Sequence, residues 1–350
     1  MKILRSALVP IIAVVLALLA GALLIQLSGS SPREAYSALF EGSFVGWERF
    51  GTTLEKATPL IMGGLAVAFA FKGGLFNIGG QGQLLFGALI AGAAGYGFTG
   101  LPWIIHMPLA LLLGAAAGAA WGAIPGVLKA TRGAHEVITT IMLNFVAANM
   151  AEWLCTKVWR EPGDILVRTP IIEGSAEIPT FGNIPLGFLI AVAFAFGMWY
   201  LLQKTTFGFE VRSVGLNPSA ASYAGISTKR IVILTMAISG FLAGIGGSIE
   251  TLGVLGRYEP GFNAGLGFDG ITIALLARTN PIAVIPSAVL IASMDASASL
   301  MQFKAGVAPE ITDVIEALIL LFVATPIIVR WFFKSRQGEE ISFGANWGSS

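Results

Sequence analysis

The stretch that decides the fold is GLFNIGGQG at residues 74–82, a glycine-rich break between two apolar segments. A degraded copy, GFNAGLGFDG, stands at residues 261–270 and again borders apolar sequence. Irregular backbone inside a bilayer leaves polar groups unpaired, so it is tolerated where protein covers it or where it lines a watery cavity. The repeated break therefore indicates a solute pathway in the interior of a membrane protein.

The composition of the chain is that of a polytopic membrane protein. Hydrophobic residues make up 55% of its 350 residues, charged residues make up 12%, and there are 44 glycines. One cysteine, Cys155, and two histidines are too few for a disulfide or a metal cluster. The net charge of +1, without a basic arm, gives no sign of nucleic-acid binding. We predict neither a metal site nor a nucleic-acid partner.

Ten apolar runs predict ten transmembrane helices in one all-α domain that occupies residues 1–350. About 20 helical residues are needed to cross the hydrocarbon core, and two of the runs, 58–71 and 268–277, fall short of that. We expect both of these to continue irregularly inside the bilayer. The runs are 7–27, 58–71, 80–97, 103–128, 134–155, 186–202, 231–249, 268–277, 282–301 and 311–329.

The distribution of positive charge predicts the orientation. If the amino terminus is cytoplasmic, most of the 21 Lys and Arg residues fall on the inner side, mainly in short segments. The two longest outer segments instead carry many acids, as the positive-inside rule favours. Both termini are therefore expected in the cytoplasm.

The repeat extends beyond the glycines. HEVITTIMLNFVA at 135–147 aligns without gaps on TDVIEALILLFVA at 312–324, with six of thirteen positions identical. Chance similarity between apolar helices is the alternative, but the break precedes the acidic helix in both copies. Five spans separate the copies, and an odd number reverses the direction across the membrane. We therefore expect inverted repeats, at about 58–155 and about 231–330, with the pathway between them.

The inner loop at 203–230 has the residues of a short helix outside the bilayer. Asn217 suits the N-cap, Pro218 suits the first helical position, and Gly225 suits the end of about two turns at 219–224. It is either an ordinary connector or a knob that docks into a soluble partner. In the second case, Ala221 and its alanine neighbours allow close approach and Tyr223 anchors.

Polar residues within the apolar runs are the candidate pathway residues, because facing lipid would be costly for them. We expect most of them to face the interior. Asn77 and Gln81 are favoured as pathway or gate residues, whereas Asp295 lines a pathway or bonds between helices. Asn144 stands where the second copy has Leu321, which makes it an asymmetry between the halves or a satisfied buried amide. The set is Asn77, Gln81, Gln83, Asn144, Asn149, Asn263, Asp269 and Asp295.

Charged residues near the outer surface have two interpretations. They dock an external protein through charge pairs, or they are ordinary solvated loop charges. They are Glu152, Glu250, Glu259, Arg160, Arg168 and Arg257.

Three motifs together carry a family resemblance: GLFNIGGQGQ, HEVITTIMLNF and GLNPSAASYAGI. The chain resembles the permease subunit of bacterial nucleoside or simple-sugar ABC importers, within the branched-chain amino acid and ribose permease superfamily. The resemblance implies a second, paralogous permease, a cytoplasmic ATP-binding subunit and an external solute-binding protein. It also implies a place in the bacterial inner membrane, with ATP and Mg bound by the partner ATPase and no cofactor on this chain.

By this resemblance the 217–225 helix is the coupling helix that sits in a cleft of the ATPase, and its motif residues are Gly215, Asn217, Pro218, Ala221, Tyr223 and Gly225. The chain has no G-x-x-x-x-G-K-[ST] motif, so ATP must be hydrolysed elsewhere. We expect a nucleoside or a related sugar to be the solute. An ion-coupled secondary transporter is the alternative, since such proteins also use inverted repeats. An intramembrane enzyme would need a nucleophile with a suitable base, which we do not find in the sequence.

Overall fold

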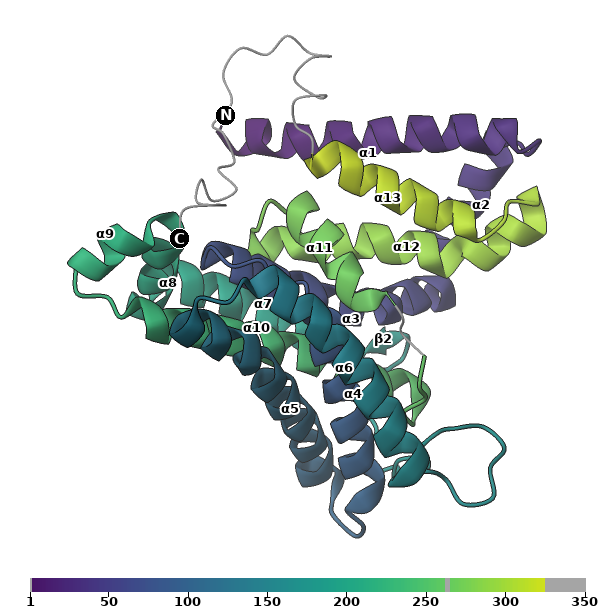
Figure 1. Cartoon of the computed structure of the whole chain (residues 1–350). Coiled ribbons are helices and arrows are strands. Elements are labelled where there is room, and N and C mark those ends of the chain that lie inside the picture. Colours follow the sequence, from purple (N-terminus) through teal and green to yellow (C-terminus); the bar gives the residue numbers. More distant parts are fainter. Residues whose placement is uncertain (1, 262–264, 325–350) are drawn as a thin grey trace.

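The structure is a computed structural model that describes residues 2–261 and 265–324 (Figure 1). Helices dominate it, and a two-stranded antiparallel hairpin pairs β1 (Thr180–Phe181) with β2 (Ile184–Pro185). The helices are α1 (Lys2–Leu27), α2 (Pro32–Phe44), α3 (Trp47–Lys72), α4 (Gly80–Gly97), α5 (Trp103–Arg132), α6 (Glu136–Lys157), α7 (Leu186–Lys204), α8 (Thr206–Leu216), α9 (Pro218–Tyr223), α10 (Thr228–Glu250), α11 (Leu266–Leu276), α12 (Pro281–Ala305) and α13 (Glu310–Ala324). A π-helical turn, η1 (Thr251–Leu255), extends α10.

The fold is all-α and polytopic, as predicted. Seven helices in the described part are long and apolar enough to cross a membrane: α1, α3, α5, α6, α7, α10 with η1, and α12. Within the described residues each of the ten predicted runs overlaps a helix, the other three being α4, α11 and α13; residues 325–329 of the last run lie outside the described part. The count of ten crossings stays a prediction. Helices α2, α8 and α9 lie between the predicted runs.

One of the two short runs is longer than predicted. We expected residues 58–71 to be too short to cross, but α3 is a continuous 26-residue helix that begins at Trp47. Its first half carries Glu48, Arg49, Glu55 and Lys56, so a hydropathy count misses a segment that is nonetheless helical. The other short run matches its prediction, because α11 has 11 residues and spans about 17 Å at 1.5 Å per residue.

Both glycine-rich stretches interrupt the helices. The chain leaves α3 at Lys72, passes Gly74 with a φ of 70°, and resumes helical structure at Gly80. The second break follows η1 and contains glycines 256, 261 and 265, all with positive φ, before α11 begins at Leu266. Left-handed backbone of this kind suits glycine, which has no Cβ to clash.

The central pair, α3 and α10, crosses antiparallel. Ser239 of α10 donates to the carbonyl oxygen of Ala66 at 2.7 Å, and Gly246 of α10 packs against Pro59, nearer the start of α3. Each helix of this pair packs on helices from the other half of the chain. Helix α3 packs on α11 and α12, whereas α10 packs on α4 and α5; likewise α4 contacts α6, and α11 contacts α13.

Helices α5 and α10 approach through their glycines. A Cβ placed on Gly118 would lie 2.4 Å from the carbonyl oxygen of Gly240, and one on Gly122 would lie 3.0 Å from the Cα of Gly240. Larger residues would push the two backbones apart, so small residues are required along this seam.

The two ends of the helix bundle differ. Figure 1 shows α1 beginning, and α13 reaching its last described residue, on the side of α8 and α9. The long segment between α6 and α7, which contains the hairpin, lies at the opposite end (Figure 1).

Candidate functional site

The two breaks meet in the centre of the molecule. The Oε1 atom of Gln81, in the first turn of α4, accepts a hydrogen bond of 2.8 Å from the backbone N–H of Gly267, in the first turn of α11. A Cβ on Gly80 would lie 3.3 Å from the carbonyl oxygen of Gly267. The amino-terminal ends of the two helices that follow the breaks are therefore held in direct contact.

Asn77 fastens the first break to its surroundings. Its side-chain amide donates to Oε1 of Gln83 and to the hydroxyl of Ser239, each at 2.8 Å, and its Oδ1 accepts from the N–H of Gly79 at 2.9 Å. Ser239 in turn donates to Ala66 of α3. The side chain of Asn77 is 1% exposed, so these bonds lie in the packed interior.

Asn144 of α6 caps the helix that follows the first break. Its Oδ1 accepts from the N–H of Gly82 at 2.8 Å, and its amide nitrogen donates to the carbonyl of Ile78 at 2.9 Å. Helix starts leave backbone N–H groups without partners, and this side chain satisfies one of them. The corresponding Leu321 of α13 is half exposed and cannot do this, so the two halves differ here.

Asn77, Gln81 and Asn144 are therefore brought together near the contact between the two breaks. Their hydrogen bonds hold the residues of the breaks in place. All three are buried within the bundle. Their contact with a solute stays a prediction. Asn263 lies outside the described residues.

The remaining polar candidates, Asp269 and Asp295, belong to a different cluster. Asp269 of α11 shares a side-chain hydrogen bond with Glu316 of α13, and the carboxyl groups of Asp295 and Asp313 lie near enough to interact with that pair electrostatically. Sequence reasoning missed Glu316. The signal was present, because Glu316 interrupts an apolar run as Asp295 does. No group of three His, Cys, Asp or Glu residues in the described ranges could hold a metal ion.

The predicted short helix is present as α9. Oδ1 of Asn217 accepts from the N–H of Ala220 at 3.0 Å, Pro218 is the first helical residue, and Gly225 follows with a φ of 84°. Tyr223 is 94% exposed, whereas Ala221 is buried. A second short helix, α8, which was not predicted, leads directly into α9 and ends at the same Asn217.

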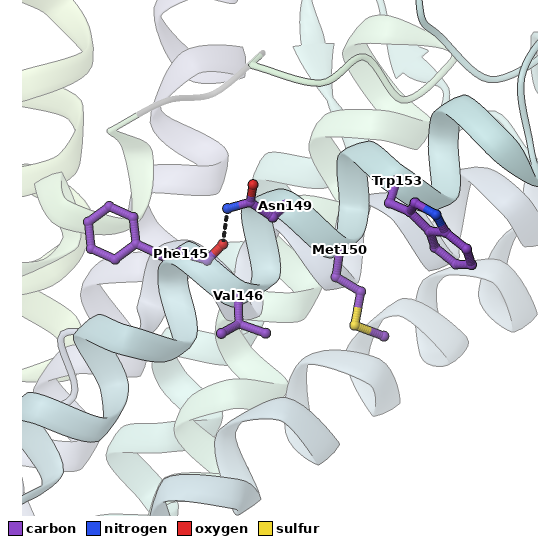
Figure 2. A pocket seen from close by; sticks show the side chains of 5 residues that line it. All are labelled: Phe145, Val146, Asn149, Met150 and Trp153. Atoms are coloured by element: carbon purple, nitrogen blue, oxygen red, sulfur yellow. Dashed lines mark hydrogen bonds between the residues drawn. The ribbon is translucent and has the colours of Figure 1, made fainter.

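The exposed face of α6 has a shallow, open hollow of about 470 Å³, which we call the α6 groove. Its lining residues all belong to this one helix: Phe145, Val146, Asn149, Met150 and Trp153 (Figure 2). We expected most of the polar candidates to face the interior, and Asn149 is an exception: it is exposed, and its amide donates to the carbonyl of Phe145 at 2.8 Å. The packed face of α6 is formed instead by Asn144, Ala147, Ala151 and Cys155.

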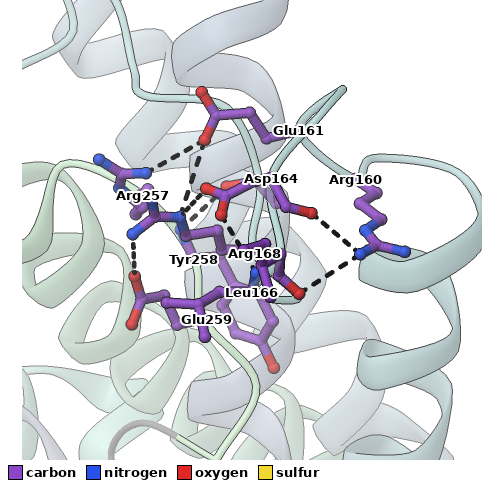
Figure 3. Close-up of polar contacts among 10 residues, drawn as sticks. Arg160, Glu161, Asp164, Leu166, Arg168, Arg257, Tyr258 and Glu259 are labelled. Atoms are coloured by element: carbon purple, nitrogen blue, oxygen red, sulfur yellow. Dashed lines mark hydrogen bonds and ion pairs between the residues drawn. The ribbon is translucent and has the colours of Figure 1, made fainter.

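Charged residues join the segment after α6 to the second break (Figure 3). Arg168 pairs with Asp164 and lies 3.6 Å from the carboxylate of Glu259, and Arg257 pairs with Glu161 at 3.1 Å. The N–H of Thr169 donates to the carbonyl of Tyr258 at 3.0 Å, so the backbones are joined as well. We name residues 160–169 and 256–259 the outer clamp.

The carboxylate of Asp164 stabilises this clamp. The backbone N–H of Leu166 and then the guanidinium of Arg168 bind it, and they hold the pKa of Asp164 below its usual range. Of the other charges predicted near the outer surface, Glu250 is buried in α10 and is therefore not available to an external protein.

Comparison with known proteins gives one family. The family described as branched-chain amino acid transport system / permease component matches residues 50–324. The chain is 42% identical to the guanosine ABC transporter permease protein NupP of Bacillus subtilis, with 94% of this chain and 96% of that protein covered. It is 35% identical to the nucleoside ABC transporter permease protein NupB of Lactococcus lactis, with coverage of 93% and 92%.

Further relatives widen the comparison. The glucose ABC transporter permease protein TsgB13 of Haloferax volcanii is 33% identical, with coverage of 90% of this chain and 86% of that protein. Bacillus subtilis and Lactococcus lactis each hold a second relative as well, 27% and 30% identical to this chain.

Proposed function

We propose that this chain, which belongs to the family of permease components of branched-chain amino acid transport systems, carries a nucleoside across the membrane. It is the membrane-spanning permease subunit of an ABC transporter, not an enzyme, and ATP is hydrolysed on a separate subunit. The ion-coupled alternative is therefore set aside. The choice of a nucleoside over a simple sugar is our proposal.

The α6 groove is the observation that carries this choice. Aromatic side chains can stack on a nucleobase, and a side-chain amide can both donate to and accept from the edge of the base. Phe145 and Trp153 supply the aromatic surfaces, and Asn149 supplies the amide between them along the helix (Figure 2). Because all five lining residues belong to α6, the α6 groove is open on its far side and needs a second wall to enclose a solute. Two of the relatives are named for guanosine and nucleoside transport.

The same face of α6 also suits contact with a second permease subunit. A polar amide that faced lipid tails would be costly, so the exposed Asn149 is better placed at a protein boundary or a watery route. Glu152, one turn further along, is exposed on the same helix and has the same preference. We propose that a second, paralogous permease covers this face and that the solute passes between the two subunits.

We further propose that the two halves of the chain are inverted repeats. Antiparallel α3 and α10, with their exchanged packing partners, support a two-fold axis that lies in the membrane plane and relates residues 58–155 to residues 231–330. Under this relation the two breaks are equivalent, and the Gln81–Gly267 contact lies close to the axis.

Helix α9 is proposed as the coupling helix, docked on a cytoplasmic ATP-binding subunit that holds ATP and Mg. The exposed Tyr223 supports this role, because nothing in the described part of the chain covers this large aromatic side chain. We accordingly propose that α9 and both termini lie in the cytoplasm of a bacterial cell. The outer clamp then lies outside, where an external solute-binding protein docks. We propose that the chain itself binds no cofactor.

Competition for uptake tests the choice of solute. The chain is reconstituted with its second permease and ATPase, and unlabelled nucleosides or sugars compete with labelled guanosine. Stacking on a base contributes about 1–3 kcal/mol, so Trp153→Ala should raise the half-saturating nucleoside concentration by roughly tenfold. Ile138→Ala, on the exposed face of α6 two turns before the groove, is the matched control and should leave it unchanged. Competition by sugars alone, or equal effects of both variants, would reject the proposal.

A further inference from the structure

Gly215, near the end of α8, presses its backbone directly against the start of the first break. A Cβ on Gly215 would lie 2.2 Å from the carbonyl oxygen of Lys72 and 2.8 Å from the backbone nitrogen of Gly74. In the opposite direction, a Cβ on Gly74 would lie 2.9 Å from the Cα of Gly215. No side chain fits between these two segments. A contact made by backbone alone has no side-chain rotamer to absorb a displacement, so movement of one segment is passed on to the other.

On one side, this contact is continuous with α9. Asn217 ends α8, where its N–H donates to the carbonyl of Ser213 at 3.0 Å, and it also begins α9, where its side chain caps the helix. Leu216, between Gly215 and Asn217, is 88% exposed, and Tyr223 is 94% exposed. A subunit that binds this exposed surface therefore acts on a segment that ends at Gly215.

On the side of the first break, the residue after Gly74 belongs to the packed interior. Leu75 is buried against Ala70 and Met236, and its N–H donates to the carbonyl of Ala70 at 3.0 Å. Two residues later, Asn77 is bonded to Gln83 and Ser239. Gln83 lies in the first turn of α4 with Gln81, which reaches the second break through Gly267. A displacement at Gly74 therefore reaches both breaks through contacts that are already made.

We infer that Gly215 is a positioning residue for transport, the point at which movement of the coupling helix enters the broken-helix centre of the permease. The inference rests on the proposed function, because it takes α9 to be the surface on which the ATPase acts. It assigns the glycine of the coupling motif a role inside this chain, in addition to any contact with the partner. Lys72, Gly74 and the end of α8 then move as one body.

The first test adds one methyl group at the contact. Gly215→Ala should hold α8 away from Lys72 and Gly74, so uptake by the reconstituted complex should fall by roughly tenfold, within the range of allosteric coupling free energies. Recovery of the complex and its ATP hydrolysis should stay near those of the wild type. Gly197→Ala in α7 is the matched control, because a Cβ there meets no atom of the described residues within 4 Å, and it should transport normally. Normal uptake by Gly215→Ala in an intact complex would overturn the inference.

A second test does not depend on the added methyl group and decides the matter if Gly215→Ala fails to assemble. Lys72 and Arg212, which lies one turn of α8 before Gly215, interact electrostatically across the junction. Cysteines at these two positions are treated with bismaleimides of increasing spacer length, and the shortest one that cross-links them is used. The native Cys155 is buried and can remain. In the Lys72→Cys/Arg212→Cys variant, cross-linking should leave uptake unchanged, because the two segments move together. Loss of uptake that depends on cross-linking would show that they separate, which contradicts the inference.

The two proposals fail in distinguishable ways. If the wild-type complex takes up no nucleoside, the proposed solute is wrong, and the Gly215 tests can be repeated with whichever solute is transported. If the wild type takes up nucleoside and Gly215→Ala does so equally well, the role of Gly215 is wrong and the proposed function stands.

Discussion

Replacing Asn144 with leucine should loosen the start of α4. Leucine is the residue that the second half of the chain has at the equivalent position, Leu321. The change removes two hydrogen bonds and leaves the N–H of Gly82 and the carbonyl of Ile78 without their partner. A buried polar group without a partner costs about 1–3 kcal/mol, and the contact at Ile78 is only partly buried, so we expect a loss of about 2–4 kcal/mol.

Hydrogen–deuterium exchange measures this loss locally. Each 1.4 kcal/mol is a factor of about ten, so the amides of residues 79–84 should exchange roughly thirty to several hundred times faster in Asn144→Leu. Amides of α10 should keep their protection, which shows that the bundle is intact. Asn149→Leu is the matched control for this measurement, since that amide bonds to the carbonyl of Phe145 within α6. Unchanged exchange at residues 79–84 in Asn144→Leu would refute the capping role.

Three further predictions concern other parts of the chain. Gly118→Ala should destabilise the fold by about 1–3 kcal/mol through overpacking, since its Cβ would lie 2.4 Å from the carbonyl oxygen of Gly240; a lower Tm than that of Gly197→Ala checks this, and equal Tm values would contradict it. The outer clamp should loosen in acid. The pKa of Asp164 is lowered in the folded protein, so its contribution to stability is complete above the unfolded-state pKa of roughly 3.9 and is lost as pH falls through the folded-state pKa. Protease cleavage of the clamp should rise in that pH range in the wild type, whereas Asp164→Asn should be cleaved readily at all pH values. Finally, Tyr223→Glu should separate ATP hydrolysis from uptake while insertion into the membrane is normal, because the side chain is exposed; failed insertion would indicate a structural role.

Much of the fold is readable in the sequence because lipid imposes simple requirements. A helix that crosses a membrane must be long and apolar, and irregular backbone needs cover, so the runs were predicted from hydropathy along the chain and both breaks from the glycine-rich motifs between them. The start of α3 was not, since Trp47 to Lys56 contains four charged residues that lower its hydropathy, although Gly51, Thr53 and Leu54 are buried. The short helix α9 was predicted with its cap, because the interaction between Asn217 and Ala220 is local.

The candidate site was only partly predictable. That Asn77, Gln81 and Asn144 matter follows from their polarity, but their partners lie far away in the chain. Gln81 and Gly267 are 186 residues apart, and the Gly215–Gly74 contact joins two segments that no local pattern relates. Asn149 is an exception to the inward orientation expected of most polar candidates, because one sequence does not reveal which face of a helix packs inward when both faces are apolar.

Whether the two breaks move when the ATPase binds ATP is tested most directly by hydrogen–deuterium exchange in the reconstituted complex. Exchange at both breaks is compared between the nucleotide-free state and a state trapped with ATP on a hydrolysis-deficient ATPase. We predict that the amides of 77–82 and 266–270 change their exchange rates together on ATP binding, because Gln81 joins the two breaks. If both segments keep the same protection in the two states while the wild-type complex transports its solute, the breaks do not move when the ATPase binds ATP. The proposed coupling between the ATPase and the breaks would then be wrong.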